Sequence, residues 1–264
     1  MSIVGVIILL SVSVVYYYRS EFFIHYYLNK TKPLNFVSNE FSRKLLYRLH
    51  IPEIKPERKY PVVVILHGGN ERGSDNKKQI ESIACTFLSR KVQNLFPSII
   101  IIPQCPQETQ WVNTGSVKTP FDHYNQSQSV ESEEMQMVVK IINKIISEYP
   151  VDREKIYVTG FSMGSTGTWD IITRHPDIFA AAVPISGRSD LSTAHILKDI
   201  PIWAFHGKLD SIAPARLNIE MQKAVLKSGG NCKLTLFENA GHYCVPQVLK
   251  NPDLIKWLFS QKKK

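Results

Sequence analysis

The sequence predicts an α/β fold in which a mostly parallel central sheet is covered on both faces by helices. Several short runs are wholly apolar, as in residues 62–66, which is typical of strands buried on both faces. Segments with apolar residues at helical spacing alternate with these runs along the chain. The 264 residues show no internal repeat, so we expect one folded domain over residues 36–264.

The first 27 residues differ from the rest in composition. No charged residue occurs from residue 3 to residue 18, aliphatic side chains dominate there, and aromatic residues follow. The run is slightly short for a membrane-spanning helix, but its aromatic flank suits a membrane interface. We therefore expect residues 1–27 to be a hydrophobic anchor or signal segment. An uncleaved anchor is favoured over a signal cut near Ser13, and a buried apolar strand or helix is the third alternative.

Location depends on the fate of this segment. An anchored chain is membrane-associated through one N-terminal segment, whereas a cleaved chain is secreted. The basic residues Arg19, Lys30 and Lys32 follow the apolar run and favour a cytoplasmic domain by the positive-inside rule. A translocated domain remains open.

The elements of the first half follow in order. Residues 28–35 are polar, contain Pro33 and are expected to form a linker. Residues 44–52 alternate well enough for a strand, and a charged turn containing proline follows them. Continuous apolar runs predict strands at 62–66 and 98–102, with a helix over 77–91 between them. Residues 103–128 are irregular, and loops of this length are usually functional.

The second half continues the alternation. Helical spacing over 132–149 predicts an amphipathic helix that faces the core. A strand at 156–159 leads into a helix that ends near His175. The remaining elements are strands at 181–185 and 201–206, a helix over 215–228 that ends at Gly229-Gly230, a strand at 233–237 and a helix over 252–261.

The stretch Gly160-Phe161-Ser162-Met163-Gly164 lies between a predicted strand and a predicted helix. This is the context that a nucleophile elbow requires. The two glycines leave room for a sharp turn that exposes the serine hydroxyl, and the helix that follows directs free N–H groups to the same point. An ordinary turn could also carry this motif, so the prediction depends on partners for Ser162.

Candidate partners follow later strands, because the carboxyl ends of parallel strands meet at one edge. Asp210 follows the strand at 201–206 and His242 follows the strand at 233–237, which gives the chain order Ser, Asp, His. A serine hydroxyl needs a base to take its proton, and the imidazole needs a carboxylate to orient it. Asp190 is the rival acid, whereas His67 and His206 are interpreted as structural residues at glycine turns.

An oxyanion hole needs two backbone N–H groups, one from the residue after the nucleophile and one from the loop after an earlier strand. Met163 supplies the first. Gly69 in His67-Gly68-Gly69-Asn70 is our first choice for the second, because glycine lets the backbone approach a substrate closely, and Asn70 is the second choice.

Composition argues against several other functions. The formal net charge is +9, but the basic residues are scattered apart from the last three lysines, so we expect no nucleic-acid partner. The four cysteines have no zinc-type spacing, so we expect no metal site and no cofactor, and their disulfide state stays open.

Further motifs join these residues, namely the runs 47–52, 60–76, 103–106 with Trp111, 160–164, 203–210 and 240–242. Together they resemble the α/β-hydrolase family of predicted peptidases and carboxylesterases related to dienelactone hydrolase and to polyhydroxybutyrate-depolymerase-type esterases. The resemblance covers the chain from about residue 36 to its end. It implies Ser162, Asp210 and His242 as a triad and places Trp111 near the acyl or alcohol pocket. Ser165 stands where the family usually has a second glycine.

The sequence therefore predicts a serine hydrolase that cleaves small carboxylic esters through an acyl-enzyme on Ser162. A peptidase with the same triad is the first alternative, because no pocket charge in the sequence separates the two. An alternative of another class is a membrane-tethered α/β-hydrolase-like binding protein without turnover, which failure to react with a serine-directed phosphonate would support.

Overall fold

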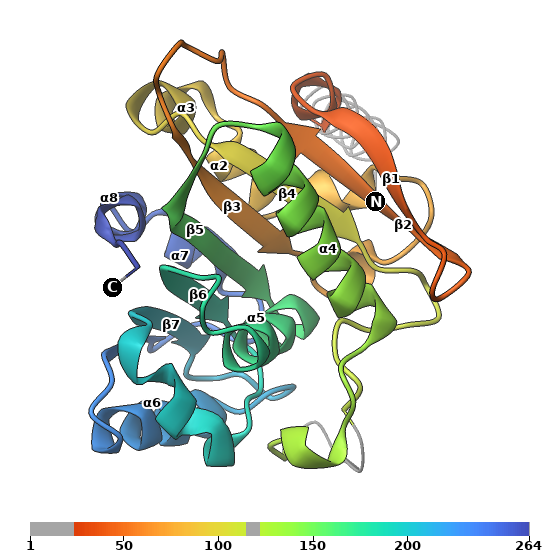
Figure 1. Ribbon diagram of the computed structural model, residues 1–264. Coiled ribbons are helices and arrows are strands. Elements are labelled where there is room, and N and C mark those ends of the chain that lie inside the picture. Colours follow the sequence, from red (N-terminus) through yellow and green to blue (C-terminus); the bar gives the residue numbers. More distant parts are fainter. Residues whose placement is uncertain (1–23, 115–121, 264) are drawn as a thin grey trace, which may run out of the picture.

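The computed structural model describes residues 24–114 and 122–263. Its centre is an eight-stranded sheet in the order β1-β2-β4-β3-β5-β6-β7-β8 (Figure 1). β2 pairs antiparallel with both of its neighbours, β1 and β4. The six strands β3 to β8 all run parallel to one another, so the predicted mostly parallel α/β fold is confirmed. The strands are β1 (Lys32–Ser38), β2 (Arg43–His50), β3 (Tyr60–Leu66), β4 (Ile99–Gln104), β5 (Val151–Phe161), β6 (Ala181–Ile185), β7 (Ile202–Gly207) and β8 (Cys232–Phe237).

Helices cover both faces of this sheet (Figure 1). One face packs against α4 (Glu133–Glu148), α5 (Met163–Arg174) and α6 (Arg216–Lys227). The other face packs against α2 (Ala84–Phe87), α3 (Arg90–Leu95), α7 (Val245–Leu249) and α8 (Leu254–Ser260).

The alternation of side chains along β3 explains its continuous apolar sequence. Val62, Val64 and Leu66 lie in the first core cluster, whereas Val63 and Ile65 lie in the second. A strand of a sheet with two covered faces buries both sets of side chains, so neither face can be polar.

Residues 77–91 do not form the single helix that we expected. They contain a 3₁₀ turn (Lys78–Ile80), the short helix α2 and the beginning of α3. Ser82 has a φ of 68°, which no α-helix residue adopts. Ser89 is extended and its Oγ accepts a hydrogen bond from the Val92 amide at 3.3 Å, so it begins a new helix as an N-cap.

The predicted linker at 28–35 is also wrong in part, because residues 32–35 belong to the edge strand β1. Leu28 and Thr31 just before β1 are buried. The Arg48 side chain on β2 holds them, since its Nη2 donates to the Leu28 carbonyl at 3.0 Å and its Nε to Thr31 Oγ1 at 2.7 Å. A short turn of helix over 24–28 ends at Leu28, and Tyr27 packs in the second core cluster.

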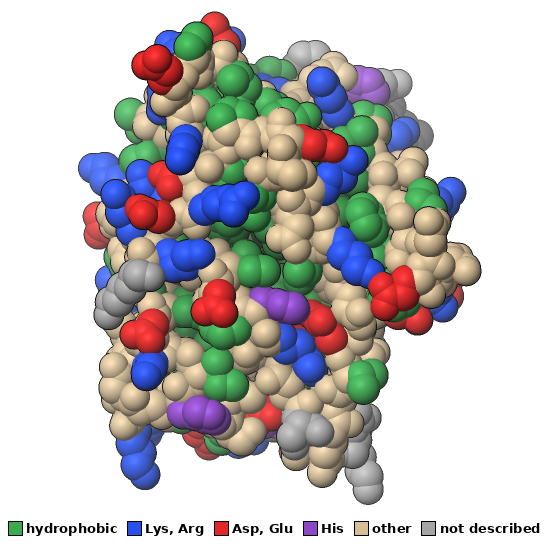
Figure 2. Space-filling model, in the orientation of Figure 1, with side chains coloured by type: hydrophobic (Ala, Val, Ile, Leu, Met, Phe, Trp, Pro, Cys, Tyr) green, Lys and Arg blue, Asp and Glu red, His purple; other side chains and the backbone are tan. Residues whose placement is uncertain are grey.

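The expected anchor or signal segment lies almost wholly outside the described residues, which begin at Ile24. Within residues 24–114 and 122–263, no helix is long and apolar enough to cross a bilayer. On the face shown in Figure 2, basic and acidic side chains are interspersed and form no continuous band of one sign. This agrees with the scattered charge of the sequence.

Candidate active site

Ser162 occupies a strained turn between β5 and α5. Its φ is 54° and its ψ is −114°, and it is the N-cap of α5. The chain can turn this sharply because its flanking residues are glycines. A Cβ atom on Gly160 would lie 2.2 Å from the Gly164 carbonyl oxygen, and one on Gly164 would lie 1.9 Å from the Leu66 carbonyl oxygen. The turn therefore requires glycine at both positions and presents the serine side chain at the carboxyl end of the sheet.

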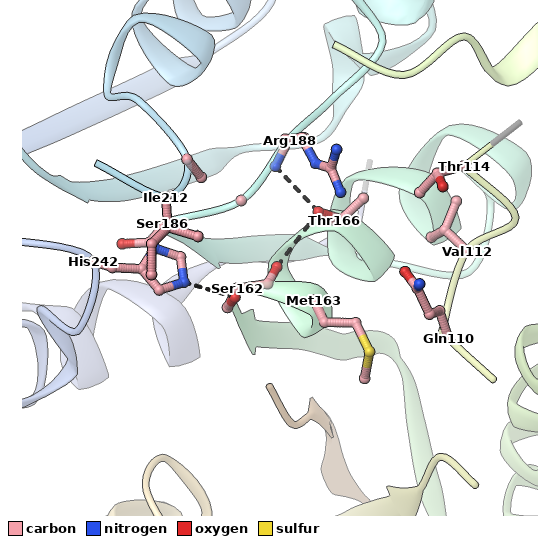
Figure 3. Close-up of a pocket in the computed structure, with 12 residues that line it drawn as sticks. Gln110, Val112, Thr114, Ser162, Met163, Thr166, Ser186, Arg188, Ile212 and His242 are labelled. Atoms are coloured by element: carbon pink, nitrogen blue, oxygen red, sulfur yellow. Dashed lines mark hydrogen bonds between the residues drawn. The ribbon is translucent and has the colours of Figure 1, made fainter. Parts of the chain in front are cut away.

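The structure brings the three residues predicted as a triad into hydrogen-bond contact. His242 Nε2 lies 2.8 Å from Ser162 Oγ (Figure 3), and His242 Nδ1 lies 2.8 Å from Asp210 Oδ2. The Asp210 side chain is fully buried, whereas 17% of the His242 side chain is exposed. Ser162 follows β5, Asp210 follows β7 and His242 follows β8, so one edge of the sheet holds all three.

The rival acid Asp190 has a different task. Its Oδ1 accepts a hydrogen bond from the Ser192 amide at 2.9 Å, and its Oδ2 accepts one from the Gln126 amide at 2.6 Å. It is the N-cap of a 3₁₀ helix (Leu191–Asp199) that the sequence did not predict. Of these two aspartates, the hydrogen bond to His242 belongs to Asp210.

The Asp210 carboxylate is surrounded by donors. Its Oδ1 accepts from the backbone amides of Ile212 and Ala213, each at 2.8 Å, and its Oδ2 also lies 3.0 Å from His206 Nε2. Burial alone would raise the pKa of Asp210, but the hydrogen bonds from His206, His242 and Ala213 outweigh it and hold this pKa well below its usual range. These hydrogen bonds therefore favour the ionised form of the carboxylate.

The loop after β3 carries Gly69, which begins a 3₁₀ turn (Gly69–Glu71). Arg72 fixes this loop, because its Nε donates to the Gly69 carbonyl at 3.0 Å and its Nη1 to the Thr109 carbonyl at 3.3 Å. Gly69 is half-buried and Asn70 is exposed. Met163, the other predicted oxyanion donor, is the first residue of α5 and lines the pocket beside Ser162.

Ser162 and His242 open into a cavity of about 120 Å³. Val112, Met163 and Ile212 form apolar parts of its wall, and Arg188 brings a cationic side chain. Burial lowers the pKa of Arg188, and the charge of Asp122 opposes this shift. Gln110, Val112 and Thr114 lie across the pocket from His242 (Figure 3).

Trp111 is not part of this wall. Its side chain is fully buried in the first core cluster, and its Nε1 donates to the His67 carbonyl at 3.0 Å. Its sequence neighbours Gln110 and Val112 line the pocket instead. Trp111 therefore supports this loop from the core side.

A second, wider groove of about 710 Å³ adjoins the pocket and shares Gln110, Val112 and Thr114 with it. The groove is polar, and its carboxylates are those of Glu108, Glu131, Glu133 and Glu134. Arg43 Nη1 lies 3.3 Å from Glu133 Oε2 and 3.5 Å from Glu134 Oε1.

Within residues 24–114 and 122–263, no three His, Cys, Asp or Glu side chains are grouped so that they could hold a metal ion. The four cysteines are buried free thiols. Burial raises the pKa of Cys85, Cys105 and Cys232 to about 12.

The sequence model of one protein family, described as phospholipase/carboxylesterase, matches residues 51–255. The chain belongs to this family. The predicted resemblance to α/β-hydrolase esterases is thereby confirmed.

Solved structures agree with this assignment. The crystal structure of a thermostable esterase is 34% identical with a TM-score of 0.82, and the match covers 89% of this chain and 64% of that one. A ferulic acid esterase is 20% identical with a TM-score of 0.62, covering 87% of this chain and 98% of that one. An acylaminoacyl peptidase of Pyrococcus horikoshii is 18% identical with a TM-score of 0.62, covering 89% and 42%. The last two likenesses show the fold alone.

One sequence relative is a bifunctional acetylxylan esterase/xylanase of Neocallimastix patriciarum, which is 29% identical over 97 residues. That match covers 37% of this chain and 14% of the relative. The chain thus spans less than two thirds of both the thermostable esterase and the bifunctional relative.

Sequence reasoning missed two features of this carboxylesterase-family site. The link from Arg72 to the Gly69 loop joins residues that belong to one motif, but the sequence does not say which backbone groups the guanidinium contacts. The contact of His206 with Asp210 had a signal, because the two residues are four positions apart at the end of one strand. The interpretation of His206 as a structural residue at a glycine turn does not include this contact.

Proposed function

We propose that the protein is a serine carboxylesterase that forms an acyl-enzyme on Ser162. The observation that carries this proposal is the continuous hydrogen-bonded series from Ser162 Oγ through His242 to the ionised Asp210, which begins at a serine in a strained turn. A serine hydroxyl with an imidazole at hydrogen-bond distance has the base that it needs to become a nucleophile.

In the proposed reaction, Ser162 Oγ attacks the ester carbonyl carbon while His242 Nε2 takes the hydroxyl proton. The carbonyl π electrons move to its oxygen, and the N–H groups of Met163 and Gly69 stabilise the resulting oxyanion. When the intermediate collapses, the C–O bond to the alcohol breaks and the alcohol oxygen takes the proton from His242. Water then attacks the acyl carbon while His242 takes one of its protons. The C–O bond to Ser162 breaks, Ser162 Oγ takes the proton back from His242, and the carboxylic acid leaves. Asp210 stays ionised throughout and stabilises the protonated imidazole.

We further propose that the acyl part is short and the alcohol part is bulky and polar. A cavity of about 120 Å³ next to Ser162 favours a short acyl group. The adjoining groove of about 710 Å³ has hydroxyl, amide and carboxylate groups that can bind hydroxyl groups of an alcohol. The name of the relative that matches over 97 residues, an acetylxylan esterase/xylanase, is consistent with such esters.

A fluorophosphonate probe tests the mechanism. We expect it to label the purified protein at Ser162, and we expect Ser162→Ala and His242→Ala to abolish the labelling. Ser186→Ala is the matched control, because Ser186 lines the same pocket and has a similar φ of 53°, but its Oγ lies 3.3 Å from Cys244 Sγ. Labelling should persist in this control. An unlabelled wild-type protein would instead support a binding protein without turnover.

A substrate panel tests the specificity. We expect p-nitrophenyl acetate and butyrate to be cleaved faster than the octanoate, because the pocket beside Ser162 is small. We expect peptide anilides to be cleaved poorly, because the aniline nitrogen is a worse leaving group than p-nitrophenolate. Rapid anilide cleavage with slow ester cleavage would make the protein a peptidase with the same residues.

We also propose that residues 3–18 attach the protein to a membrane, because this run contains no charge and is flanked by aromatic residues. The full chain should sediment with membranes after a high-salt wash, whereas a chain that begins at Ile24 should stay in solution with the same esterase activity. The truncation is placed before Tyr27 because Arg48 holds Leu28 and Thr31. A mature protein that begins after Ser13 would show a cleaved signal and a secreted protein.

A further inference from the structure

His206 is a fully buried histidine at the end of β7, and its Nε2 faces two oxygen atoms. The Asp210 Oδ2 atom lies at 3.0 Å and the Ala213 carbonyl oxygen at 2.6 Å. A nitrogen without a hydrogen would present its lone pair to two acceptors, which is repulsive. Nε2 must therefore carry a hydrogen and donate it.

The other ring nitrogen leads to the same tautomer by an independent route. Asn218 Nδ2 on α6 lies 2.8 Å from His206 Nδ1, and Asn218 Oδ1 lies 3.2 Å from Trp169 Nε1. An indole N–H can only donate, so it selects the amide oxygen of Asn218 as its partner. The amide NH₂ group then donates to His206 Nδ1, which must accept and therefore has no hydrogen. Trp169 and Asn218 are buried like His206, so no water competes for these groups.

These hydrogen bonds form a series that begins at a residue of α5 and ends at the N-cap of the same helix. Trp169 lies on α5, and the N-cap of α5 is Ser162. Hydrogen bonds lead from Trp169 to Asn218 and to His206, and from there to Asp210. Asp210 binds His242, and His242 binds Ser162. The helix that positions the nucleophile thus also holds the residue that orients the far end of the series.

We propose that Trp169 and Asn218 lock His206 as a neutral Nε2–H donor, and that His206 is a positioning residue which tunes the basicity of His242 through Asp210. The catalytic part of this inference rests on the proposed esterase function. A donor on Oδ2 withdraws negative charge from the carboxylate, so the carboxylate stabilises the protonated His242 less. His242 then loses its proton at lower pH, and activity extends further into acid.

Two other titratable groups lie near the Asp210–His242 pair. One is the Cys244 thiol. Burial raises the pKa of this thiol, and the negative charge of Asp210 raises it further, so the thiol stays neutral. Arg188 lines the pocket with His242 and keeps its charge at every pH of interest. Neither group changes charge between pH 5 and 7, so the acidic limb reports on the Asp210–His242 pair.

The pH dependence of Ser162 labelling by a fluorophosphonate tests the proposal, because this reaction needs the same base and no ester turnover. In His206→Leu, which cannot donate, the midpoint of the acidic limb should rise by roughly 0.5–1 pH unit. His206→Gln has an amide that can donate and should return the midpoint to near the wild-type value. Asn218→Leu keeps His206 but removes the amide group that fixes its tautomer. This variant should therefore raise the midpoint of the acidic limb by less than His206→Leu does.

The control is His50→Leu, which removes a half-buried histidine whose Nδ1 lies 2.8 Å from the Lys30 carbonyl, far from these contacts. Its midpoint should not move. If His206 only supports the fold, its loss loosens the Asp210–His242 contact, and the midpoint of His206→Leu stays in place or falls, which overturns the proposal. If His206→Leu does not fold, an unmoved midpoint in Asn218→Leu overturns it equally. An unlabelled wild-type protein contradicts the esterase function itself, so the two failures are distinct.

Discussion

Two loops at the carboxyl edge of the sheet have the same sequence pattern and different chemistry. After β3 the chain reads His67-Gly68-Gly69-Asn70-Glu71, and after β7 it reads His206-Gly207-Lys208-Leu209-Asp210. Each pattern begins with a buried histidine and ends with an acidic residue four positions later. The comparison shows how partners from elsewhere in the chain decide what such a pattern does.

The two histidines have opposite tautomers. His67 Nδ1 lies 2.6 Å from the Gly68 carbonyl oxygen and donates to it, while its Nε2 accepts from the Cys105 amide at 2.9 Å. Burial lowers the pKa of His67 to about 4, so this ring is neutral and joins two stretches of backbone. His206 instead carries its hydrogen on Nε2 and contacts a carboxylate.

The two acids differ in the same way. Burial raises the pKa of Glu71, and hydrogen bonds from backbone amides offset only part of this effect. In Asp210 the donors outweigh burial and lower the pKa. The β3 loop is therefore a backbone scaffold, whereas the β7 loop holds a stabilised negative charge.

The largest difference is expected when each acid loses its charge. Asp210→Asn should lower kcat/KM for p-nitrophenyl acetate by about 10⁴-fold, because the imidazole loses the partner that sets its tautomer. Glu71→Gln should lower it less than about tenfold, since Glu71 makes no contact with His242 among the described residues. Equal losses in the two variants would remove the distinction between the loops.

The support of the β3 loop gives the next largest effect. Arg72→Ala removes the hydrogen bonds to the Gly69 and Thr109 carbonyls, so the Gly69 amide should lose its fixed direction. We expect kcat to fall by about 10- to 100-fold with little change in KM. Arg216→Ala on α6, which removes an exposed pair with Glu220, is the control and should leave kcat unchanged. A change in KM alone would mean that the loop binds the ester but does not stabilise its oxyanion.

Replacing the glycine that follows each histidine should lower the thermal stability of the protein by different amounts in the two loops. A Cβ atom on Gly207 would lie 2.1 Å from the Gly241 carbonyl oxygen, in the backbone next to His242. A Cβ atom on Gly68 would meet side-chain atoms of Glu71 and Phe161 at 3.1 Å, and these can shift. Gly207→Ala should lower Tm by about 3–10 °C, and Gly68→Ala by at most about 3 °C. Thermal melts followed by circular dichroism measure this, and the reverse order would contradict it.

The smallest expected effect is the pH dependence of stability. The lowered pKa of Asp210 means that its contribution is present above the ordinary value of about 3.9 and is lost as the pH falls through the lowered pKa. The raised pKa of Glu71 means the opposite, a contribution present below about 4.3 and lost as the pH rises through the raised pKa.

Tm values from pH 2 to pH 7 test these signs. The destabilisation caused by Asp210→Asn should stay nearly constant above about pH 4 and should shrink below it, as the pH falls toward the lowered pKa of Asp210. Glu71→Gln should gain a few degrees relative to the wild type as the pH rises, because it removes a charge that the fold disfavours. Parallel curves for the two variants would show that the acids are not in different environments.

Much of the fold could be predicted because burial on two faces imposes wholly apolar strands. The strand at 181–185 was located without error, and the glycine stop after α6 has the positive φ of 82° at Gly229. The edge strand β1 was missed because only one side of it is covered, which leaves a weak alternation interrupted by Pro33. The break at Ser82 was missed because a serine with positive φ has no local sequence signal.

In the candidate active site, too, the features that have a local sequence signal could be predicted and the others could not. The proximity of Ser162, Asp210 and His242 could be predicted because their chemistry and their places after strands are both visible in the sequence, and the structure places them in hydrogen-bond contact. The partners of His206 could not be predicted, because Asn218 and Trp169 come from two helices and only the packed sheet brings them together. Trp111 was assigned to the pocket by resemblance, but its indole N–H binds a buried carbonyl and turns the ring into the core.

The clamp that Arg48 makes on Leu28 and Thr31 limits the reach of the enzyme. Residues 24–28 are helical and Tyr27 is packed in the core, so residues 19–23 are what is left to link residues 3–18 to the domain. At no more than about 3.5 Å per residue, such a link spans at most about 20 Å. If residues 3–18 enter a membrane as proposed, this short link keeps the domain that carries Ser162 close to the lipid surface. The enzyme would then sample only esters that diffuse to that surface or lie in it.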